Sequence, residues 1–397
     1  MRTCGAYTTP RRPAILKQAP NVQTIGVIGG GQLGRMIALD AKRMGYDVIV
    51  LDPADRSPCG QVADEQIVAA YDDLAAMEEL GRRSDVVTYE FENIAIAAVE
   101  HLERSGYLVA PGSHVLRVTQ DRLLEKQFVR DCGIATADFA PVRSADDLEA
   151  AAHSVGFPAI LKTVSGGYDG KGQYRVDDLA AARAAFERAG GVALIWEAVV
   201  PFVKELSVVA TRANDDSTIA FPPGENQHDD GILMMTIAPA RVDDAIAGHA
   251  KAMAATIGRR LGIVGTYCIE LFLLADGTLL VNEIAPRPHN SGHYTIDATP
   301  CSQYEQHVRA ICNLPLSPPT LLRSAIMHNI LGSGSGNMLV GASAMLADPS
   351  IALHIYGKRH AVARRKMGHF TMLVDGPIAP TDIARATAAH KNLTWEP

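Results

Sequence analysis

The sequence has no C-x-x-C pair among its six cysteines and no histidine spacing of the kind that binds zinc. Scattered cysteines are typical of free thiols in a reducing compartment, so we expect a cytoplasmic protein without disulfides. The sequence also has no run of about 18 apolar residues, which predicts that no helix crosses a membrane. Residues 1–21 are basic, lack acids and lack the apolar core of a secretory signal, so we expect a disordered N-terminal extension.

An excess of positive charge is missing as well. The net charge of −7 argues against non-specific binding to nucleic acid or to a membrane surface. The chain has 397 residues, too many for one ordinary core, and it shows no internal repeat and no low-complexity tract. We therefore expect a globular protein of two to three domains.

The stretch 24–53 predicts a strand, a glycine turn, a helix and a second strand. Gly29, Gly31 and Gly34, with Asp52 at the end of the second strand, match the G-x-G-x-x-G dinucleotide fingerprint. Such glycines let the backbone N–H groups at a helix N-terminus approach a phosphate. This single match leaves three interpretations open: a NAD site, a site for a phosphate or other anion, and a turn without a ligand.

The stretch CIELFLLADGTLLVNEIA, residues 268–285, predicts a β-hairpin because Asp-Gly separates two apolar runs. If Asp276 and Gly277 form the turn, Leu274 lies opposite Leu279 and the strands pair outward from there. Both faces are then apolar, which predicts a buried hairpin. One face carries Phe272, Leu274, Leu279 and Val281, and the other carries Ile269, Leu271, Leu273, Leu280 and Ile284.

The same register places Glu270 directly opposite Glu283. Opposite side chains share a face about 5 Å apart, where like charges repel. Three explanations are open. A Mg²⁺ ion can lie between the carboxylates and take further ligands from substrate phosphates; one carboxyl can be protonated; or a three-residue turn can shift the register so that they do not face each other.

A glycine-rich segment, SGGYDGKGQ at residues 165–173, lies between two predicted strands. Its backbone N–H groups can wrap phosphates, and Lys162, at the end of the preceding strand, can reach the same phosphates. The segment lacks the G-K-[ST] of a Walker A loop. A flexible hairpin tip without a ligand is the alternative.

Two further stretches concentrate polar groups. Arg287, His289, Asn290 and His293 follow Glu283 among stiffening prolines, which suits a small oxyanion substrate, with a zinc site or solvated histidines as alternatives. Residues 356–370 are basic in an otherwise acidic chain, which indicates an anion site or a solvated basic face. The basic residues are Lys358, Arg359, Arg364, Arg365 and Lys366.

Taken together, these stretches resemble the ATP-grasp ligases, and among them the N5-carboxyaminoimidazole ribonucleotide synthetases of de novo purine synthesis. The resemblance covers nearly the whole chain from about Gln23. Each motif is weak alone, but their ordered series is specific. The motifs are GGGQLGRM, TQDRLLEKQF, ILKTVSGGYDGKGQ, QHDDGIL, ELFLLADGTLLVNEIAPRPHNSGH and RKMGH.

The resemblance implies a mixed α/β and α+β multidomain fold. A Rossmann-like pre-ATP-grasp domain would span residues 22–124, and an ATP-grasp domain of two subdomains, with a glycine-rich lid at about 163–175, would span 125–320. A small β-rich domain would span 321–397. The implied reaction is the ATP- and bicarbonate-dependent carboxylation of aminoimidazole ribonucleotide through carboxyphosphate, giving ADP and phosphate.

The resemblance also implies site residues. Glu270 and Glu283 would hold Mg²⁺, with Mn²⁺ as a substitute, on the phosphates of ATP. The residues implied for ATP binding are Arg122, Lys162, Gly167, Tyr168, Asp169, Gly170, Lys171, Gly172, Gln173, Glu197, Ala198, Val199, Val200, Glu205, His228, Asn282 and Glu283. Those implied for the ribotide and bicarbonate are Gly31, Gln32, Leu33, Glu90, Arg287, His289, Asn290, Lys358, Arg365 and Lys366. Tyr168, Arg287, His289, Asn290 and Lys358 are implied as catalytic.

One departure from the family pattern concerns the basic stretch. Relatives usually have Arg-Pro-Gly-Arg-Lys before Met-Gly-His, whereas this chain has Val-Ala-Arg-Arg-Lys at 362–366. The residue that meets the ribotide phosphate is therefore open, with Arg364 as one candidate for the missing charge.

Three rival functions are weighed against this one. The nearest is another ATP-grasp ligase acting on a ribotide, such as a formate-dependent transformylase. A NAD-dependent dehydrogenase and an ATP-binding regulator without turnover are the others, and the Glu270/Glu283 pair argues against the regulator. The family implies a homodimer and, because no mutase-like segment follows Pro397, hand-off of the product to a separate mutase.

Overall fold

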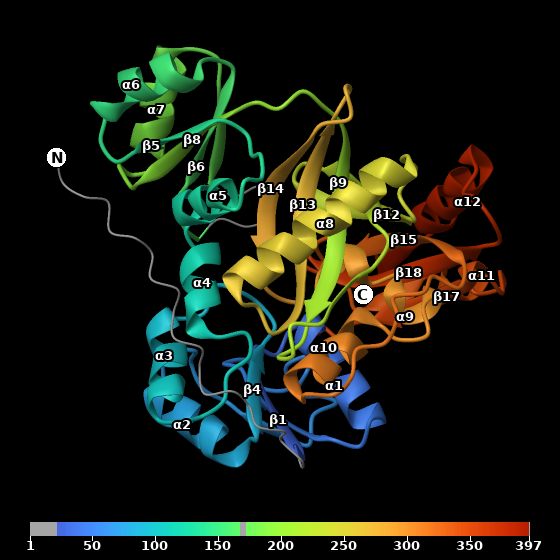
Figure 1. Ribbon diagram of the computed structural model, residues 1–397. Coiled ribbons are helices and arrows are strands. Elements are labelled where there is room, and N and C mark those ends of the chain that lie inside the picture. The colour runs from blue at the N-terminus through green and yellow to red at the C-terminus, as the bar shows by residue number, and fades with distance from the viewer. Residues whose placement is uncertain (1–21, 167–171, 397) are drawn as a thin grey trace.

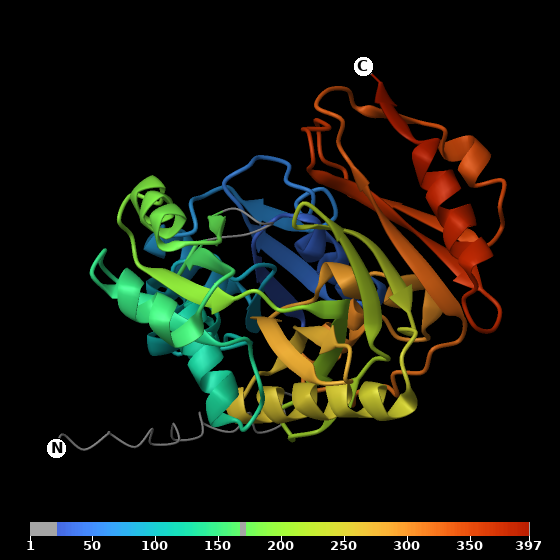
Figure 2. The ribbon, with the colours of Figure 1, turned by 90° about the horizontal axis from the view of Figure 1, so that it is seen from above.

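The computed structural model describes residues 22–166 and 172–396. The expectations for residues 1–21 and for Gly167, Tyr168, Asp169, Gly170 and Lys171 lie outside these ranges. Three layered regions and a C-terminal segment surround a common centre (Figures 1 and 2).

The N-terminal region is built on a parallel sheet with strand order β3-β2-β1-β4. Its central strands are continuous apolar runs because helices cover both faces: α1 and α10 pack on one face, and α2 and α3 on the other. The elements are β1 (Thr24–Ile28), α1 (Gln32–Arg43), β2 (Asp47–Leu51), β3 (Glu65–Ile67), α2 (Leu74–Arg83), β4 (Val86–Tyr89), α3 (Ile96–Arg104) and α4 (Ser113–Thr119).

A small antiparallel sheet, with strand order β5-β8-β6-β7, forms a separate lobe, green at the upper left of Figure 1. Helices α6 and α7 bury apolar faces on this sheet, around the fully buried Trp196. The helix α5 precedes the lobe. The elements are α5 (Arg122–Asp131), β5 (Phe139–Val142), α6 (Asp147–Val155), β6 (Ala159–Thr163), β7 (Gln173–Val176), α7 (Leu179–Arg188) and β8 (Leu194–Ala198).

The largest sheet has nine strands, and its main path runs β14-β13-β9-β11-β12-β15-β18-β17, with β10 paired to β9. The elements of its first part are β9 (Phe202–Arg212), β10 (Thr218–Ala220), β11 (Gly224–Asp229), β12 (Ile232–Ala238), α8 (Asp244–Leu261), β13 (Gly265–Leu274), β14 (Leu279–Ala285), η1 (Asn290–Gly292), α9 (Thr295–Ala298) and α10 (Gln303–Ile311).

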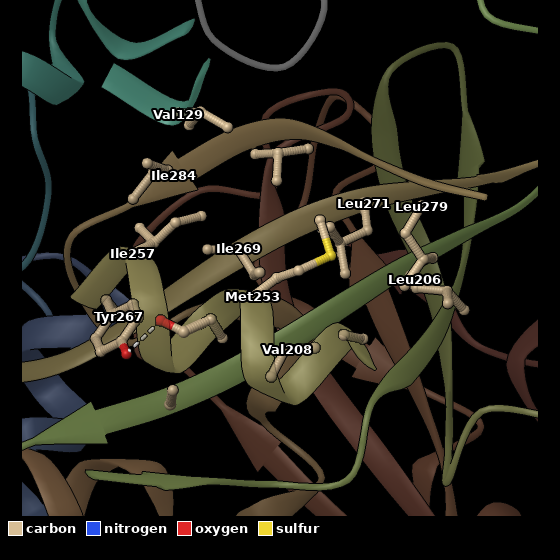
Figure 3. Packing of buried hydrophobic residues seen from close by; sticks show 14 of the residues in the cluster. Val129, Leu206, Val208, Met253, Ile257, Tyr267, Ile269, Leu271, Leu279 and Ile284 are labelled. Carbon is tan, nitrogen blue, oxygen red and sulfur yellow. Dashed lines mark hydrogen bonds between the residues drawn. The ribbon is translucent and has the colours of Figure 1, made fainter. Parts of the chain in front are cut away.

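Helix α8 covers one face of this sheet (Figure 3). Met253 and Ile257 point from the helix toward β13 and β14, and the Tyr267 hydroxyl donates a hydrogen bond to the Ala254 carbonyl at 2.9 Å. The helix ends at Gly262, whose φ of +68° is the left-handed conformation that glycine adopts without a steric penalty. This packing makes the sheet a rigid base for the side chains on its opposite face.

The C-terminal segment continues the same sheet, because β12 pairs with β15 across the expected domain boundary at 320/321. Helix α12 and the β16–β19 pair pack around its own apolar cluster. The elements are β15 (Ser324–Leu331), β16 (Met338–Val340), α11 (Ala342–Met345), β17 (Ile351–Ile355), β18 (Lys366–Val374), α12 (Pro380–Lys391) and β19 (Thr394–Glu396).

The hairpin of β13 and β14 corrects the register expected near its turn. Leu273, not Leu274, lies opposite Leu279, because the loop holds three residues and ends at Gly277, whose φ is +87°. A β-bulge at Asn282 then adds one residue to β14 and restores the expected pairing farther out. Glu270 therefore does lie opposite Glu283.

The faces of the hairpin change as well. Leu279 and Val281 were expected beside Phe272, but the three-residue loop places them with Leu271 and Leu273 on the buried face toward α8. The opposite face, with Phe272 and Leu280, is only half-buried. The expectation that both faces are fully buried is therefore wrong: the second face borders the cavity described next.

Candidate active site

A cavity of about 810 Å³ is lined by residues from the N-terminal region, the small sheet, the large sheet and the C-terminal segment. Most of the residues predicted from the sequence lie along it. They are Gln32, Leu33, Glu90, Arg122, Lys162, Gln173, Glu205, His228, Glu270, Asn282, Glu283, Arg287, His289, Asn290 and Lys366.

Other predicted residues lie near the cavity without lining it. Glu197 is buried behind Lys162, and strand β8 ends at Ala198, so Val199 and Val200 follow the strand rather than belong to it. Gly31, Gly172, Lys358 and Arg365 are also outside the lining.

Glu270 and Glu283 are held in place by basic side chains. The His289 Nε2 lies 3.2 Å from Glu270 Oε1, and the Arg122 Nη1 lies 3.4 Å from Glu283 Oε2. Burial alone would raise the pKa of Glu270, but the hydrogen bond and charge of His289 lower it to about 2. Glu270 is therefore a carboxylate, which argues against a protonated Glu270 as the explanation for the facing pair.

The same pairing acts on His289. Burial alone would lower its pKa, but its contacts with Cys268 and Glu270 raise it to about 10. The Nδ1 of His289 accepts a hydrogen bond from the Ser291 N–H at 3.3 Å, so the Nε2 directed at Glu270 carries the ring proton. This places an N–H donor beside the carboxylate pair.

The donor set fits a magnesium ion that is shared with phosphates. Two carboxylates that face each other at the cavity wall are hard oxygen ligands, and Mg²⁺ commonly takes only one or two protein carboxylates. Within residues 22–166 and 172–396, no group of three or more His, Cys, Asp or Glu side chains could hold a metal by itself. The zinc alternative therefore has no support among the described residues.

Lys162 extends from β6 to the cavity wall, and its ammonium group forms an ion pair with the buried Glu197. Its Nζ lies 2.8 Å from Glu197 Oε2, and Lys126 Nζ lies 3.5 Å from the same oxygen. Burial raises the pKa of Glu197, but the two lysines outweigh burial and lower it. The strand end thus presents a fixed ammonium group in reach of a polyanion.

Two aromatic rings in the cavity wall were missed in the sequence. Phe202 and Phe272 stack with ring centroids 4.8 Å apart, close to the hydrogen-bonded pair Glu205 Oε2 and His228 Nδ1 at 2.8 Å. Phe272 was detectable, since strand alternation places it on the same face as Glu270. The arrangement offers an apolar surface beside a carboxylate, as a nucleoside requires.

Arg287 is fixed by a partner that was also missed. Glu92 accepts two hydrogen bonds from its guanidinium, at 2.5 Å from Nε and 3.0 Å from Nη2. Burial raises the pKa of Glu92, but the Arg287 charge outweighs burial and lowers it. This bidentate pair orients Arg287 next to His289 and Asn290 at the cavity wall.

The backbone N–H groups of the glycine turn before α1 donate hydrogen bonds to two carboxylates of the protein itself. Glu90 accepts hydrogen bonds from the N–H groups of Gly31 and Gly34, and Asp52 accepts from Gly30 at 2.7 Å. Asp52 also accepts a hydrogen bond from the Tyr71 hydroxyl, so its carboxylate already binds groups of the protein where a NAD site would bind the ribose. These bonds argue against a NAD site.

The basic stretch of the C-terminal segment divides between the cavity and the surface. Lys366 lines the cavity, and Lys358 donates a hydrogen bond to the Lys366 carbonyl at 2.6 Å. Arg364 instead reaches the β11–β12 turn, where its Nη2 lies 3.2 Å from Asp230 Oδ2. Arg364 therefore does not line the cavity itself but contacts Asp230, which does.

Comparison with known proteins agrees with this geometry. Three family models match consecutive parts of the chain: a ribonucleotide synthetase preATP-grasp domain at 22–120, an ATP-grasp domain at 127–304 and a phosphoribosylaminoimidazole carboxylase C-terminal domain at 325–377. The N5-carboxyaminoimidazole ribonucleotide synthase of Bacillus subtilis is 44% identical over 353 residues, which are 88% of this chain and 91% of the relative. The chain belongs to the N5-carboxyaminoimidazole ribonucleotide synthase family.

Solved structures of this family superpose closely on the chain. An ADP complex of an N5-carboxyaminoimidazole ribonucleotide synthetase matches with a TM-score of 0.86 and 44% identity, covering 93% of this chain and 96% of that one. The Aspergillus clavatus enzyme, solved with ADP and 5-aminoimidazole ribonucleotide, matches with a TM-score of 0.83 and 31% identity over the same shares.

The expected fold class is thereby confirmed: an ATP-grasp fold with an N-terminal pre-ATP-grasp domain and a β-rich C-terminal domain. Among the described residues, no helix has the length and apolar character needed to cross a bilayer.

Proposed function

We propose that the protein is an ATP-dependent ligase that carboxylates 5-aminoimidazole ribonucleotide to N5-carboxyaminoimidazole ribonucleotide in de novo purine synthesis. One observation carries the proposal. A single cavity joins a facing carboxylate pair, Glu270 and Glu283, to the cations Lys162 and Arg287 and to the first residues of α1, Gln32 and Leu33. The curated relatives at 40–44% identity carry the same activity in their names.

ATP would lie along the large sheet. Phe202 and Phe272 would pack against adenine, Glu205 would accept from the ribose, and Lys162 would meet the phosphates. The ammonium group of Lys162, held by Glu197, would stabilise negative charge that develops on the transferred phosphoryl group. Arg122 and Gln173 line the same part of the cavity and would add donors.

Glu270 and Glu283, with Asn282 beside them, would hold Mg²⁺ or Mn²⁺. When bound, the ion supplies positive charge to the β- and γ-phosphates. The protein's own part is to hold the two side chains facing each other, with Arg122 against Glu283 and His289 against Glu270.

Bicarbonate would bind between Arg287, His289 and Asn290. It attacks the γ-phosphorus of ATP to give carboxyphosphate and ADP, and the amine of the ribotide then takes up the carboxyl group with release of phosphate. Arg287 would hold the anion in line, because Glu92 fixes its guanidinium. Exclusion of water protects a short-lived acyl phosphate, and we assign this task to the glycine-rich segment at about 163–175 with Tyr168.

The ribotide would occupy the end of the cavity beside α1. Gln32, Leu33 and Glu90 line that end, and Lys366 approaches from the C-terminal segment. Lys366, whose carbonyl accepts a hydrogen bond from Lys358, is the candidate for the ribotide phosphate. Gly31 precedes Gln32 in the chain, and Arg365 precedes Lys366, so both would also contribute to this end of the site.

Several finer assignments belong to the same proposal. We infer three domains at 22–124, 125–320 and 321–397, a cytoplasmic homodimer, and release of the product to a separate mutase. The five cysteines among the described residues are free thiols, which suits a reducing compartment.

The test is Mg²⁺-dependent release of ADP by the purified protein, with and without bicarbonate and aminoimidazole ribonucleotide. We expect release to require both and a carboxylated ribotide to form. Release with formate and a different ribotide would instead assign the protein to the transformylase-type ligases, and no release with any combination would contradict the proposal.

A further inference from the structure

Helix α5 carries two adjacent ionisable side chains that are almost completely buried. Glu125 is 3% exposed and Lys126 is 2% exposed. Charged side chains are rarely buried to this degree unless they have specific partners. Neither residue lines the cavity, so substrate contact does not explain them.

Their partners are backbone groups on both sides of Glu283. The Glu125 Oε2 accepts a hydrogen bond from the Ile284 N–H at 3.1 Å, and the Lys126 Nζ donates one to the Asn282 carbonyl at 3.2 Å. Strand β14 is the edge strand of the large sheet, so no further strand satisfies these outward groups. Val129, one turn further along α5, lies against the same strand near Ile284 (Figure 3).

The backbone segment that Glu125 and Lys126 contact, Asn282–Ile284, contains the β-bulge of β14. If β14 had no bulge, the register set at the turn would continue, and Glu270 would lie opposite Asn282 instead of Glu283. Bulges commonly re-aim a side chain next to an active site. The facing carboxylates therefore depend on a local irregularity that α5 holds from outside the sheet.

Lys126 also links the bulge to the small sheet. Its ammonium group lies 3.5 Å from Glu197 Oε2, the oxygen that Lys162 contacts at 2.8 Å. One buried lysine thus connects the strand that carries Glu283 with the strands that carry Lys162 and Glu197.

We propose that Glu125 and Lys126 are positioning residues that clamp the Asn282–Ile284 backbone so that Glu283 faces Glu270, and that this clamp sets the affinity of the site for a metal–nucleotide complex. The inference rests on the proposed function, since it takes Glu283 to be a ligand of the metal. Glu125 and Lys126 act through β14 and touch no substrate.

Removing one half of the clamp leaves a buried backbone group without a partner, which is unfavourable because the group has lost its water and gains no hydrogen bond in exchange. Leucine at position 125 leaves the Ile284 N–H unpaired, whereas glutamine keeps a side-chain oxygen that accepts from it. Glu125→Gln is therefore the matched control for Glu125→Leu.

The experiment measures ADP affinity of the full chain by calorimetry, with and without Mg²⁺. The Mg²⁺ gain is the ratio of the ADP affinity with Mg²⁺ to the ADP affinity without it. We expect this ratio to be at least tenfold smaller in Glu125→Leu than in wild type, while the metal-free ADP affinity stays within about threefold of wild type. Glu125→Gln should keep the gain within about twofold. An undiminished gain in Glu125→Leu would overturn the clamp.

A cycle with Glu283→Gln separates positioning from general loss of stability. If the clamp acts through Glu283, adding Glu125→Leu to Glu283→Gln should cause no further loss of the Mg²⁺ gain. If Glu125→Leu lowers the Mg²⁺ gain as much in the Glu283→Gln background as it does in the wild-type background, the clamp is overturned. A full Mg²⁺ gain in Glu283→Gln alone would overturn the metal assignment on which the clamp rests.

Thermal unfolding of each variant shows whether it is folded. If Glu125→Leu does not fold, Lys126→Met tests the other half of the clamp, because methionine fills the space without donating to the Asn282 carbonyl. It should lose the Mg²⁺ gain, and Lys126→Arg, which keeps a donor, should retain more of it. A full gain in Lys126→Met would contradict the proposal.

Discussion

The acidic side chains in and behind the cavity each contact a basic side chain. Glu270 faces His289, Glu283 faces Arg122, Glu92 faces Arg287 and Glu197 faces two lysines. Each pair is at least partly buried, where an unpartnered charge is costly. A substitution that removes one member of a pair should therefore affect binding and turnover, because it leaves the other member without its partner.

Glu283→Gln is the sharpest test at the residue scale. It removes one negative charge from the facing pair and keeps the shape of the side chain, so we expect the fold to persist and turnover to fall by about 10²–10³ or more. Rates of ADP release and circular dichroism measure the two effects. Near-normal turnover would remove the metal assignment.

Arg364 has a backbone conformation that L-residues seldom adopt. Its φ is +63°, yet its guanidinium contacts the Asp229 and Asp230 carbonyls and the Asp230 carboxylate. The left-handed conformation costs roughly 1–2 kcal/mol, and an exposed ion pair returns about 0–1 kcal/mol.

We accordingly predict that Arg364→Gly leaves the free energy of unfolding equal to wild type or raises it by up to about 1 kcal/mol, since glycine relieves the strain. Denaturant unfolding measures the difference, and Asp230→Asn serves as a control that removes only the ion pair. A loss of more than about 1 kcal/mol in Arg364→Gly would mean that the contacts outweigh the strain.

At the scale of elements, the hairpin β13–β14 has two unequal faces. Leu279 is buried against α8, whereas its neighbour Leu280 is half-buried on the face toward the cavity. The three-residue loop decides which leucine is inside, because a shift of one residue exchanges the faces.

Leu279→Ala should lower the free energy of unfolding by about 2–5 kcal/mol, and Leu280→Ala should lower it by clearly less. The two changes delete the same atoms from adjacent positions, so each is the control for the other in denaturant unfolding. Equal losses, or a larger loss at Leu280, would contradict the register.

At the scale of the whole molecule, His307 joins the N-terminal sheet to the large sheet. Its Nε2 bonds to the Thr88 hydroxyl at 2.8 Å, and its Nδ1 accepts from the Thr266 N–H at 3.0 Å. This network requires a neutral ring, because a protonated Nδ1 would face another donor. Burial lowers the pKa of His307 to about 3.

The consequence is a stability that depends on pH. Between pH 6.5 and 3 the unfolded chain binds a proton at His307 and the folded chain does not, so the free energy of unfolding falls as the pH falls, by up to about 1.4 kcal/mol per pH unit. In His307→Asn, which keeps an acceptor oxygen but does not titrate, the decline should be shallower by about that amount. Denaturant unfolding at pH 7, 6 and 5 measures it, and parallel declines would contradict the assignment.

The sequence was sufficient where the signal is local. Periodicity predicted β1, α1 and β2, and the Asp-Gly dipeptide predicted the hairpin with Glu270 opposite Glu283. The turn length and the bulge at Asn282 were not predictable, because two irregularities that cancel leave no trace in the pairing of the outer residues. Nor was the role of Glu92, which depends on the approach of Arg287 from 195 positions away.

By itself, the sequence determined the order of the motifs, the chemistry available in each and the family to which the chain belongs, since these depend on residue types and spacings along the chain. Only the tertiary structure decided which charges meet. Glu90 and Asp52 close the glycine turn, Arg364 turns to Asp230, and α5 grips β14, because each of these contacts joins segments whose separation in the chain says nothing about their distance in space.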